Sequence, residues 1–226
     1  HAEEAAFLWL QRDAAIHEPH YTLKDIAHLD DRLEAHIDGL RIAGESGWEI
    51  CKQALALNEP GEVFVAALLA FEGEDGQRVD EVVKVAIESP ENWRALISAI
   101  GWLSDEDYQR WVPGLLKAND LSYRRLAIAA SVIHRQDSAT ALAAALDDPE
   151  PNFQRRALRA VGELKRRDLL PVLKQKFKSD DTACQFWSAW SAVLLCDKSS
   201  LDVLKTFATA ESAFLEPALQ LMLRVM

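Results

Sequence analysis

Glycine, proline and cysteine are scarce in this 226-residue sequence, with 9, 8 and 3 residues respectively. Their scarcity excludes a collagen-like chain, a low-complexity linker and a small disulfide scaffold, because each of those is rich in one of them. The three cysteines are Cys51, Cys184 and Cys196, an odd number without C-x-x-C spacing. Cys184 and Cys196 lie twelve residues apart on one predicted helix, too far to be bridged. We therefore predict free thiols and a reducing, cytoplasmic location.

Long apolar runs and a surplus of basic charge are also missing. The longest apolar run, Val63–Phe71, has nine residues, whereas a membrane-spanning helix needs about 20. The 36 acidic and 25 basic side chains give a net charge of -11, which disfavours nucleic acid and anionic membranes as partners. The charge is uneven, since residues 1–120 carry 24 acidic and 10 basic side chains and residues 121–226 carry 12 and 15. Basic side chains concentrate over residues 155–178.

Motifs that carry chemistry are absent as well. The sequence has no G-x-x-x-x-G-K-[ST], G-x-S-x-G or H-E-x-x-H, which removes the motifs of nucleotide-binding loops, serine hydrolases and zinc proteases. His17 and His20 flank Pro19, and His28 and His36 are two helical turns apart, about 12 Å along the axis. A metal site needs three or four convergent ligands. We expect no metal, no cofactor and no catalysis.

The sequence lacks strand signals, and its apolar residues recur at spacings of three and four, which is typical of helices. Five segments share a small residue followed by apolar ones, with first residues 32, 30, 31 and 31 apart. Those first residues are Ala67, Ala99, Ala129, Ala160 and Ser191. A turn with helix-capping residues precedes each segment, and a second amphipathic segment follows it. These second segments are Val79–Glu88, Tyr108–Lys117, Ala139–Leu146, Leu169–Phe177 and Leu201–Phe207.

This period of about 31 residues predicts helix–turn–helix units that bury their apolar faces against one another in an α-solenoid. The small residues would let neighbouring helices approach closely. Acidic clusters such as residues 72–75 and 105–107 precede helices, where they favour the positive end of the helix dipole, and we interpret them as structural.

The N-terminal part predicts three further helices, over residues 3–16, 23–43 and 48–57, with Thr22 and Asp25 forming a capping box at the second. We predict a helical cap over residues 1–46 and a repeat array over residues 47–226. Residues 214–226 have the pattern of the first half of a sixth unit. The array is therefore expected to end in mid-repeat, with either further sequence or an atypical closing helix after it.

Residues 148–173 closely resemble the HEAT repeat, in particular the short class of the phycobilin-lyase-like proteins. The pattern D-x-x-x-x-V-R-x-x-A-x-x-A-L-G is met at Asp148, Phe153, Ala157, Ala160, Val161 and Gly162. Gln154 stands at the position of the family's arginine, and the neighbouring Arg155 is expected to replace it. The other units are degenerate copies in the same register, so the resemblance covers residues 47–212. It implies a right-handed solenoid of about five to six HEAT-like helix pairs.

The N-terminal block resembles a family of proteobacterial HEAT-repeat proteins with no assigned activity, through residues 2–10, 20–23, 30–41 and 47–49. The genes of that family sometimes lie with type VI secretion spike clusters. This resemblance implies an adaptor or chaperone-like role.

Three arginines recur at 30 and 31 residues, Arg94, Arg124 and Arg155, and would form a ladder along the concave groove. They either bond the Asp of the preceding turn, as in HEAT arrays, or form an anion-binding stripe.

A second group of candidates lies in the last complete unit and comprises Arg159, Phe186, Trp187 and Trp190. Tryptophan and arginine are enriched at binding hot spots. Alternatively, the tryptophans pack against a following repeat.

We therefore predict a non-catalytic scaffold that binds a protein partner through the groove, with an acidic partner segment meeting residues 150–178 and a basic one meeting the N-terminal half. The alternative is a nucleic-acid enzyme resembling the helical-repeat alkylpurine DNA glycosylases, which combine basic and aromatic residues with a carboxylate. No carboxylate is clearly placed for that role, and the acidic N-terminal half would repel a duplex. A third possibility is a segment that spaces two flanking regions of a longer protein.

Overall fold

The computed structural model describes residues 1–136, 138–209 and 211–225. Across these residues the chain has fourteen α-helices, three short 3-10 helices and no strand, which confirms the all-α prediction. The chain divides into two compact units, His1–Trp111 and Val112–Met226. No helix in the described ranges is both long and apolar enough to span a membrane.

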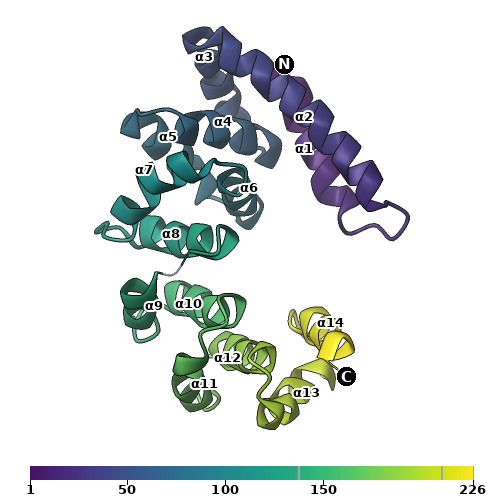
Figure 1. Cartoon of the computed structure of the whole chain (residues 1–226), viewed down its shortest axis with the longest axis vertical. Coiled ribbons are helices and arrows are strands. Elements are labelled where there is room, and N and C mark those ends of the chain that lie inside the picture. The colour runs from purple at the N-terminus through teal and green to yellow at the C-terminus, as the bar shows by residue number, and fades with distance from the viewer. Residues whose placement is uncertain (137, 210, 226) are drawn as a thin grey trace. The chain divides into compact units, whose positions relative to one another are not determined.

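The first unit begins with two helices that lie side by side and are joined by the loop over residues 16–22 (Figure 1). The helices of this unit are α1 Ala2–Ala15, α2 Leu23–Ala43, α3 Glu45–Ala54 with the 3-10 helix Leu55–Leu57, α4 Pro60–Glu72, α5 Gly76–Ala86, α6 Pro90–Ile100 and the start of α7 Asp105–Leu115. Helix α1 packs on both α2 and α4. The boundary of a separate cap at residue 46 stays a prediction.

Capping residues determine where several of these helices begin. The predicted capping box is confirmed, because Thr22 Oγ1 accepts from the Asp25 amide at 3.3 Å while the Asp25 carboxylate accepts from the Thr22 amide at 2.9 Å. Helices α5 and α7 begin three residues earlier than predicted. Asp75 accepts from the Gln77 amide at 2.9 Å, and Ser104 accepts from the Asp107 amide at 3.1 Å. Each of these side chains satisfies an amide that a helix start leaves free.

The core of the first unit is built around Trp9 of α1. Its ring stacks on Phe64 with centroids 5.3 Å apart, and its Nε1 donates to Ser98 Oγ at 3.0 Å. Helix α4 contains the nine-residue apolar run and is buried on almost every side. The run therefore forms a core helix of the first unit.

The second unit continues the repeat. Its helices are α8 Leu121–Ile133, α9 Ala139–Ala145, α10 Pro151–Glu163, α11 Leu170–Lys176, α12 Thr182–Leu194, α13 Leu201–Thr209 and α14 Leu215–Val225, with 3-10 turns at Arg167–Leu169 and Lys198–Ser200. Helices α8, α10 and α12 stack in chain order, with α9 and α11 along one side of the stack (Figure 1). The five small residues that set the period are all buried, as predicted.

The contact between α10 and α12 shows why small residues recur. A Cβ added to Gly162 would lie 2.7 Å from Ser191 Cα. Ser191 Oγ donates to the Leu158 carbonyl at 2.7 Å, so the two helices are joined through a backbone acceptor. A larger side chain at either position would force the helices apart.

Helices α8, α10 and α12, the inner helices of this unit, end in the same backbone turn. Each is followed by a non-glycine residue in the left-handed region, and the next amide donates to a carbonyl of the last helical turn. The left-handed residues are Arg135, Lys165 and Cys196, with φ of 54°, 56° and 66°, and the bonds are Gln136 to Ser131 at 2.8 Å, Arg166 to Val161 at 2.9 Å and Asp197 to Ala192 at 3.0 Å. This is a Schellman ending without the usual glycine. Cys196 therefore lies beyond α12, which corrects the prediction that it shares a helix with Cys184.

Candidate functional site

The three predicted ladder arginines have different surroundings. Arg94 of α6 is ion-paired with Asp13 of α1. The guanidinium of Arg124 lies over the ring of Phe153, 5.3 Å from its centre, and lines a small hollow of about 110 Å³. Its buried Nε has no hydrogen-bond partner among the described residues.

Arg155 does not replace the family's arginine, and this expectation is wrong. Gln154 itself bonds the preceding turn, because its Nε2 donates to the carbonyls of Leu146 at 2.8 Å and Asp148 at 3.3 Å. Arg155 reaches forward instead, and its Nε donates to Asp181 at 3.2 Å. An amide is long enough for the short reach to the preceding turn, which leaves the arginine free to join α10 to the start of α12.

Asp181 is the N-cap of α12 and also the partner of Arg155. It accepts from the Cys184 amide at 2.7 Å. The hydrogen bond from Arg155 lowers the pKa of Asp181 to about 2, with a further contribution from the Cys184 amide and with burial opposing the shift. The carboxylate is therefore charged throughout the physiological pH range. It links Arg155 of α10 to the first turn of α12.

The basic cluster over residues 155–178 is largely occupied by ion pairs. Besides Arg155 with Asp181, the pairs are Arg156–Glu163 at 2.7 Å, Arg159–Glu163 at 2.8 Å, Arg166–Asp168 at 2.7 Å, Lys174–Asp197 at 2.9 Å and Lys176–Asp147 at 3.4 Å. Burial lowers the pKa of Arg156, and Glu163 opposes that shift. A duplex would have to compete with these acids for the same side chains.

Phe186 was predicted to contact a partner, and this prediction is wrong. The side chain is fully buried. It stacks on Phe214 with ring centroids 4.5 Å apart and contacts Phe207 edge-on at 5.3 Å. These aromatic contacts hold α12 against α13 and the start of α14, so Phe186 belongs to the core.

Arg159, Trp187 and Trp190 do come together. The Arg159 Cζ lies 4.9 Å from the ring centre of Trp187 and 5.8 Å from that of Trp190, and the two indoles meet edge-on at 5.6 Å. They line an open hollow of about 390 Å³, named here the Trp–Arg hollow. Its walls are Arg159 from α10, Trp187, Trp190 and Leu194 from α12, and Pro217, Gln220, Leu221 and Arg224 from α14. Both tryptophans are half-buried, because they pack against the core on one side and face the hollow on the other.

The α14 wall was missed by sequence reasoning, although the sequence holds a signal for it. Pro217, Gln220, Leu221 and Arg224 lie at i, i+3, i+4 and i+7, which places them on one helix face. The Trp–Arg hollow combines two indoles, an amide and two guanidinium groups. Such a surface can hold a carboxylate beside an apolar or aromatic group.

Comparison with known proteins agrees with the repeat architecture. Residues 138–221 match the family model of HEAT repeats, a range that runs from α9 into α14 and includes most of the Trp–Arg hollow. No curated protein matches the chain. The match supports a HEAT-repeat protein.

Proposed function

We propose that the chain is a non-catalytic protein-binding scaffold, and that its Trp–Arg hollow takes a partner segment with a carboxylate beside an apolar or aromatic side chain. HEAT repeats commonly mediate contacts between proteins, which supports the general role. The observation that carries the proposal is the convergence of Arg159, Trp187 and Trp190 with Arg224 around one open hollow.

Size and chemistry both favour a peptide side chain as the occupant. A hollow of about 390 Å³ lies at the small end of ligand pockets and accommodates one or two side chains. Half-buried tryptophans offer large rigid contact areas that lose little conformational entropy on binding, which is why they dominate many interfaces.

The charged side chains of the Trp–Arg hollow indicate the charge of the partner segment. Arg159 shares Glu163 with Arg156, whereas Arg224 has no ion-pair partner among the described residues. Arg224 is also exposed, so an incoming carboxylate can reach it without displacing another acid. This favours an acidic partner segment, but at Arg224 of α14 and not at residues 150–178, where the sequence predicted it. The role in type VI secretion stays a prediction from the N-terminal resemblance, and the ion pairs of the basic cluster weaken the basis for the DNA glycosylase alternative.

The test is binding of short labelled peptides that combine glutamate or aspartate with phenylalanine or leucine, followed by fluorescence anisotropy. Arg224→Glu is expected to weaken binding by about tenfold, because a charge-assisted contact is replaced by repulsion. Trp190→Ser should weaken it to a similar extent through lost apolar contact.

Arg167→Glu is the matched control, since Arg167 is an exposed arginine of the same unit that does not line the hollow. It should change the affinity by less than about twofold. Equal losses in Arg167→Glu and Arg224→Glu, or no binding of any acidic aromatic peptide, would contradict the proposal.

A further inference from the structure

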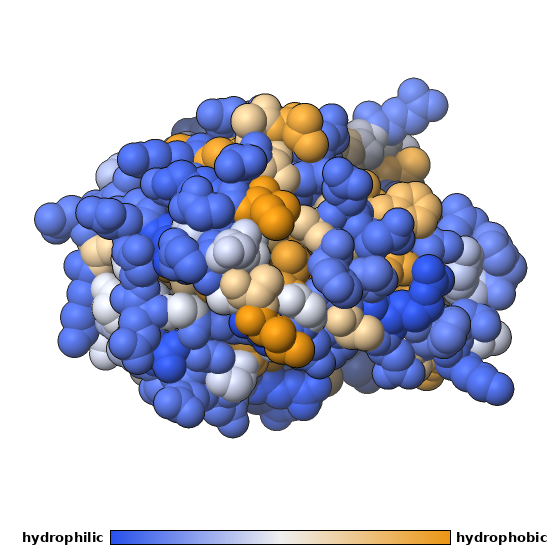
Figure 2. All heavy atoms as spheres, turned by 90° about the horizontal axis from the view of Figure 1, so that it is seen from above, coloured by the Kyte–Doolittle hydropathy of each residue, from blue (hydrophilic) through white to orange (hydrophobic). Residues whose placement is uncertain are grey.

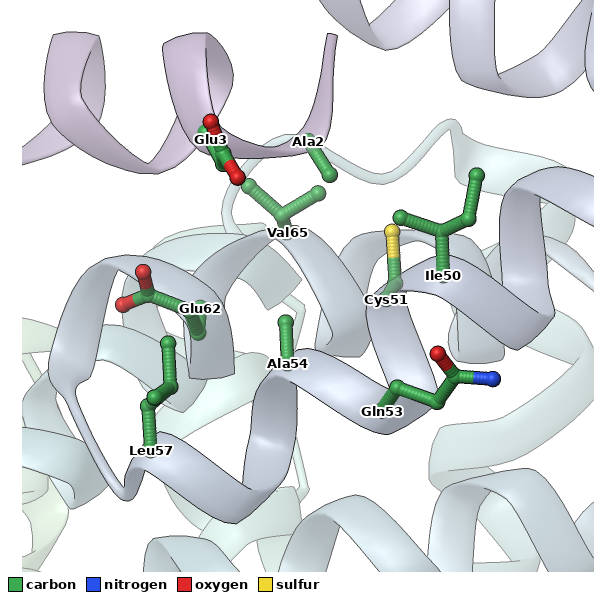
Figure 3. Close-up of a pocket in the computed structure, with 9 residues that line it drawn as sticks. All are labelled: Ala2, Glu3, Ile50, Cys51, Gln53, Ala54, Leu57, Glu62 and Val65. Atoms are coloured by element: carbon green, nitrogen blue, oxygen red, sulfur yellow. The ribbon is translucent and has the colours of Figure 1, made fainter.

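Another hollow lies in the first unit, between α1, α3 and α4, and has a volume of about 280 Å³ (Figure 3). We name it the N-terminal pocket. Figure 3 shows the side chains of Val65 and Ala54 directed into its centre, with Ile50 and Cys51 at one side and Glu3 and Glu62 at the other.

The floor of the N-terminal pocket is apolar. Val65 and Cys51 are buried, each only 2% exposed. Burial raises the pKa of the Cys51 thiol to about 11, so the thiol that lines the pocket is uncharged at physiological pH. A pocket of this volume and lining accepts a large apolar side chain.

The rim of the pocket exposes two large apolar side chains. Ile50 is 55% exposed and Leu57 is 64% exposed, and both line the opening. Figure 2, a view from above Figure 1, shows apolar side chains exposed among a mostly hydrophilic surface. Apolar groups collected beside a hollow are typical of an interaction site.

Two carboxylates give this site its specificity. Many acids of the first unit are paired, such as Glu72 with Arg41 and Glu81 with Lys52. Glu3 and Glu62 have no ion pair or hydrogen bond within the described residues, although both line the pocket. The unit carries 23 acidic and 9 basic side chains, so its field attracts cations toward these two carboxylates.

We propose that the N-terminal pocket binds a basic amphipathic segment of a partner protein. One large apolar side chain fills the space above Val65 and contacts Ile50 and Leu57, while lysine or arginine on the same segment pairs with Glu3 and Glu62. An anionic membrane does not fit, because the carboxylates repel it. This partner segment is opposite in charge to the one proposed for the Trp–Arg hollow, so the two sites take different segments.

The probe is a short amidated helical peptide of alanine and lysine with one leucine, measured against the full chain by fluorescence anisotropy at low and high salt. Two comparison peptides replace the leucine by serine, or the lysines by glutamate. The leucine–lysine peptide should bind, and added salt should weaken it. Each comparison peptide should bind at least about tenfold more weakly, because it lacks either the apolar or the charged contact.

Substitutions in the chain test whether the peptide binds at the N-terminal pocket. Glu3→Gln with Glu62→Gln should weaken the leucine–lysine peptide by roughly three- to tenfold. Ile50→Ser should weaken it to a similar extent without a change of charge. Ala54→Leu fills the pocket with a helix-compatible side chain and should also block the peptide.

The matched control is Asp31→Asn with Glu74→Gln, which removes the same charge at two other exposed acids of the unit. This pair should leave binding within about twofold. Circular dichroism checks that every variant is folded. The proposal is overturned if the control pair weakens binding as much as the Glu3 and Glu62 pair, if the serine peptide binds as well as the leucine peptide, or if no peptide binds.

Discussion

Asp181 shows how a single side chain joins two repeats. It caps α12 through the Cys184 amide and accepts a hydrogen bond from Arg155 of the preceding inner helix. The position of α12 against α10 therefore depends on a carboxylate as well as on apolar packing. Asp120 has the same capping role at α8, where it accepts from the Ser122 amide at 2.7 Å. A side-chain cap at the helix start is thus shared by repeats whose other residues differ.

The charge of Asp181 makes part of the stability depend on pH. Its pKa is about 2 in the folded chain, below the ordinary value near 3.9, so the ion pair stabilises the fold above about pH 4 and is lost as the pH falls toward 2. Asp181→Asn keeps a capping oxygen and should cost about 1 kcal/mol at pH 7, with a smaller cost at pH 3. Urea unfolding at both pH values measures this. Asp180→Asn, one residue away and exposed, should show no such change, and a cost for Asp181→Asn that stayed constant with pH would contradict the assignment.

At the residue scale, the sequence predicts which residues make contacts better than it predicts the direction in which each side chain reaches. The arginine spacing is real, but Gln154 makes the bond to the preceding turn that was expected of Arg155. The three aromatic residues of α12 could not be told apart in advance. Phe186 is buried because Phe214 stacks on it, and that contact depends on how the segment after α13 folds back. Trp187 and Trp190, predicted to face a partner or a further repeat, contact the core and line the hollow at once.

At the element scale, α10 and α12 approach closely where Gly162 meets Ser191, because a Cβ added to the glycine would lie 2.7 Å from Ser191 Cα. The same device recurs in the first unit, where a Cβ on Gly61 would lie 2.6 Å from the Ala6 carbonyl oxygen, at the contact of α4 with α1. Backbone atoms cannot move aside as flexible side chains do. The residue size at these positions therefore fixes the spacing of the helices.

Gly162→Ala should destabilise the protein by about 1–2 kcal/mol, because overpacking against Ser191 exceeds the gain of up to about 1 kcal/mol in helix propensity. Gly114→Ala is the matched control, since a Cβ there meets nothing within 4 Å. It should be neutral or stabilising. Chemical denaturation of the two variants gives the comparison, and equal effects would mean that the approach of α10 to α12 carries no energetic cost.

Helix positions were largely predictable because the period and the caps act locally. The predicted 23–43 helix coincides with α2. The five residues that set the period of about 31 lie, as expected, in helices α4, α6, α8, α10 and α12. The starts of α5 and α7 were missed by three residues because the capping roles of Asp75 and Ser104 were not recognised. The α14 wall of the Trp–Arg hollow was missed for a different reason. Its face is readable in the sequence, but the helix that it faces is set by tertiary packing.

At the scale of the whole molecule, the chain consists of two compact units with different charge. The first carries 23 acidic and 9 basic side chains, and the second carries 13 and 16. The clusters that form the core of the second unit draw on side chains from Leu116 to Met222. Each unit therefore has its own buried core, and the two proposed sites lie on different units with opposite charge preferences.

Because each unit has its own core, we expect a core substitution in one unit to destabilise that unit and leave the other folded. Trp9→Ala removes the stacking on Phe64 and the bond to Ser98, at a cost of about 3–5 kcal/mol. Hydrogen exchange should then show lost protection within residues 1–111 and retained protection in α8 to α12. Phe186→Ala is the reciprocal variant and should affect the second unit alone. Parallel loss of protection in both units, in either variant, would show that they unfold as one.

The shared ending of α8, α10 and α12 has a consequence for how such a chain can change in length. Arg135, Lys165 and Cys196 have the same backbone conformation, 30 and 31 residues apart, and the chain leaves each of them through the same hydrogen-bonded turn. The stretches of chain between these positions therefore begin and end at the same type of turn. Recombination at these points would duplicate or delete a whole unit while keeping the same turn at the junction, so the repeat number of the array can vary without a new type of connection.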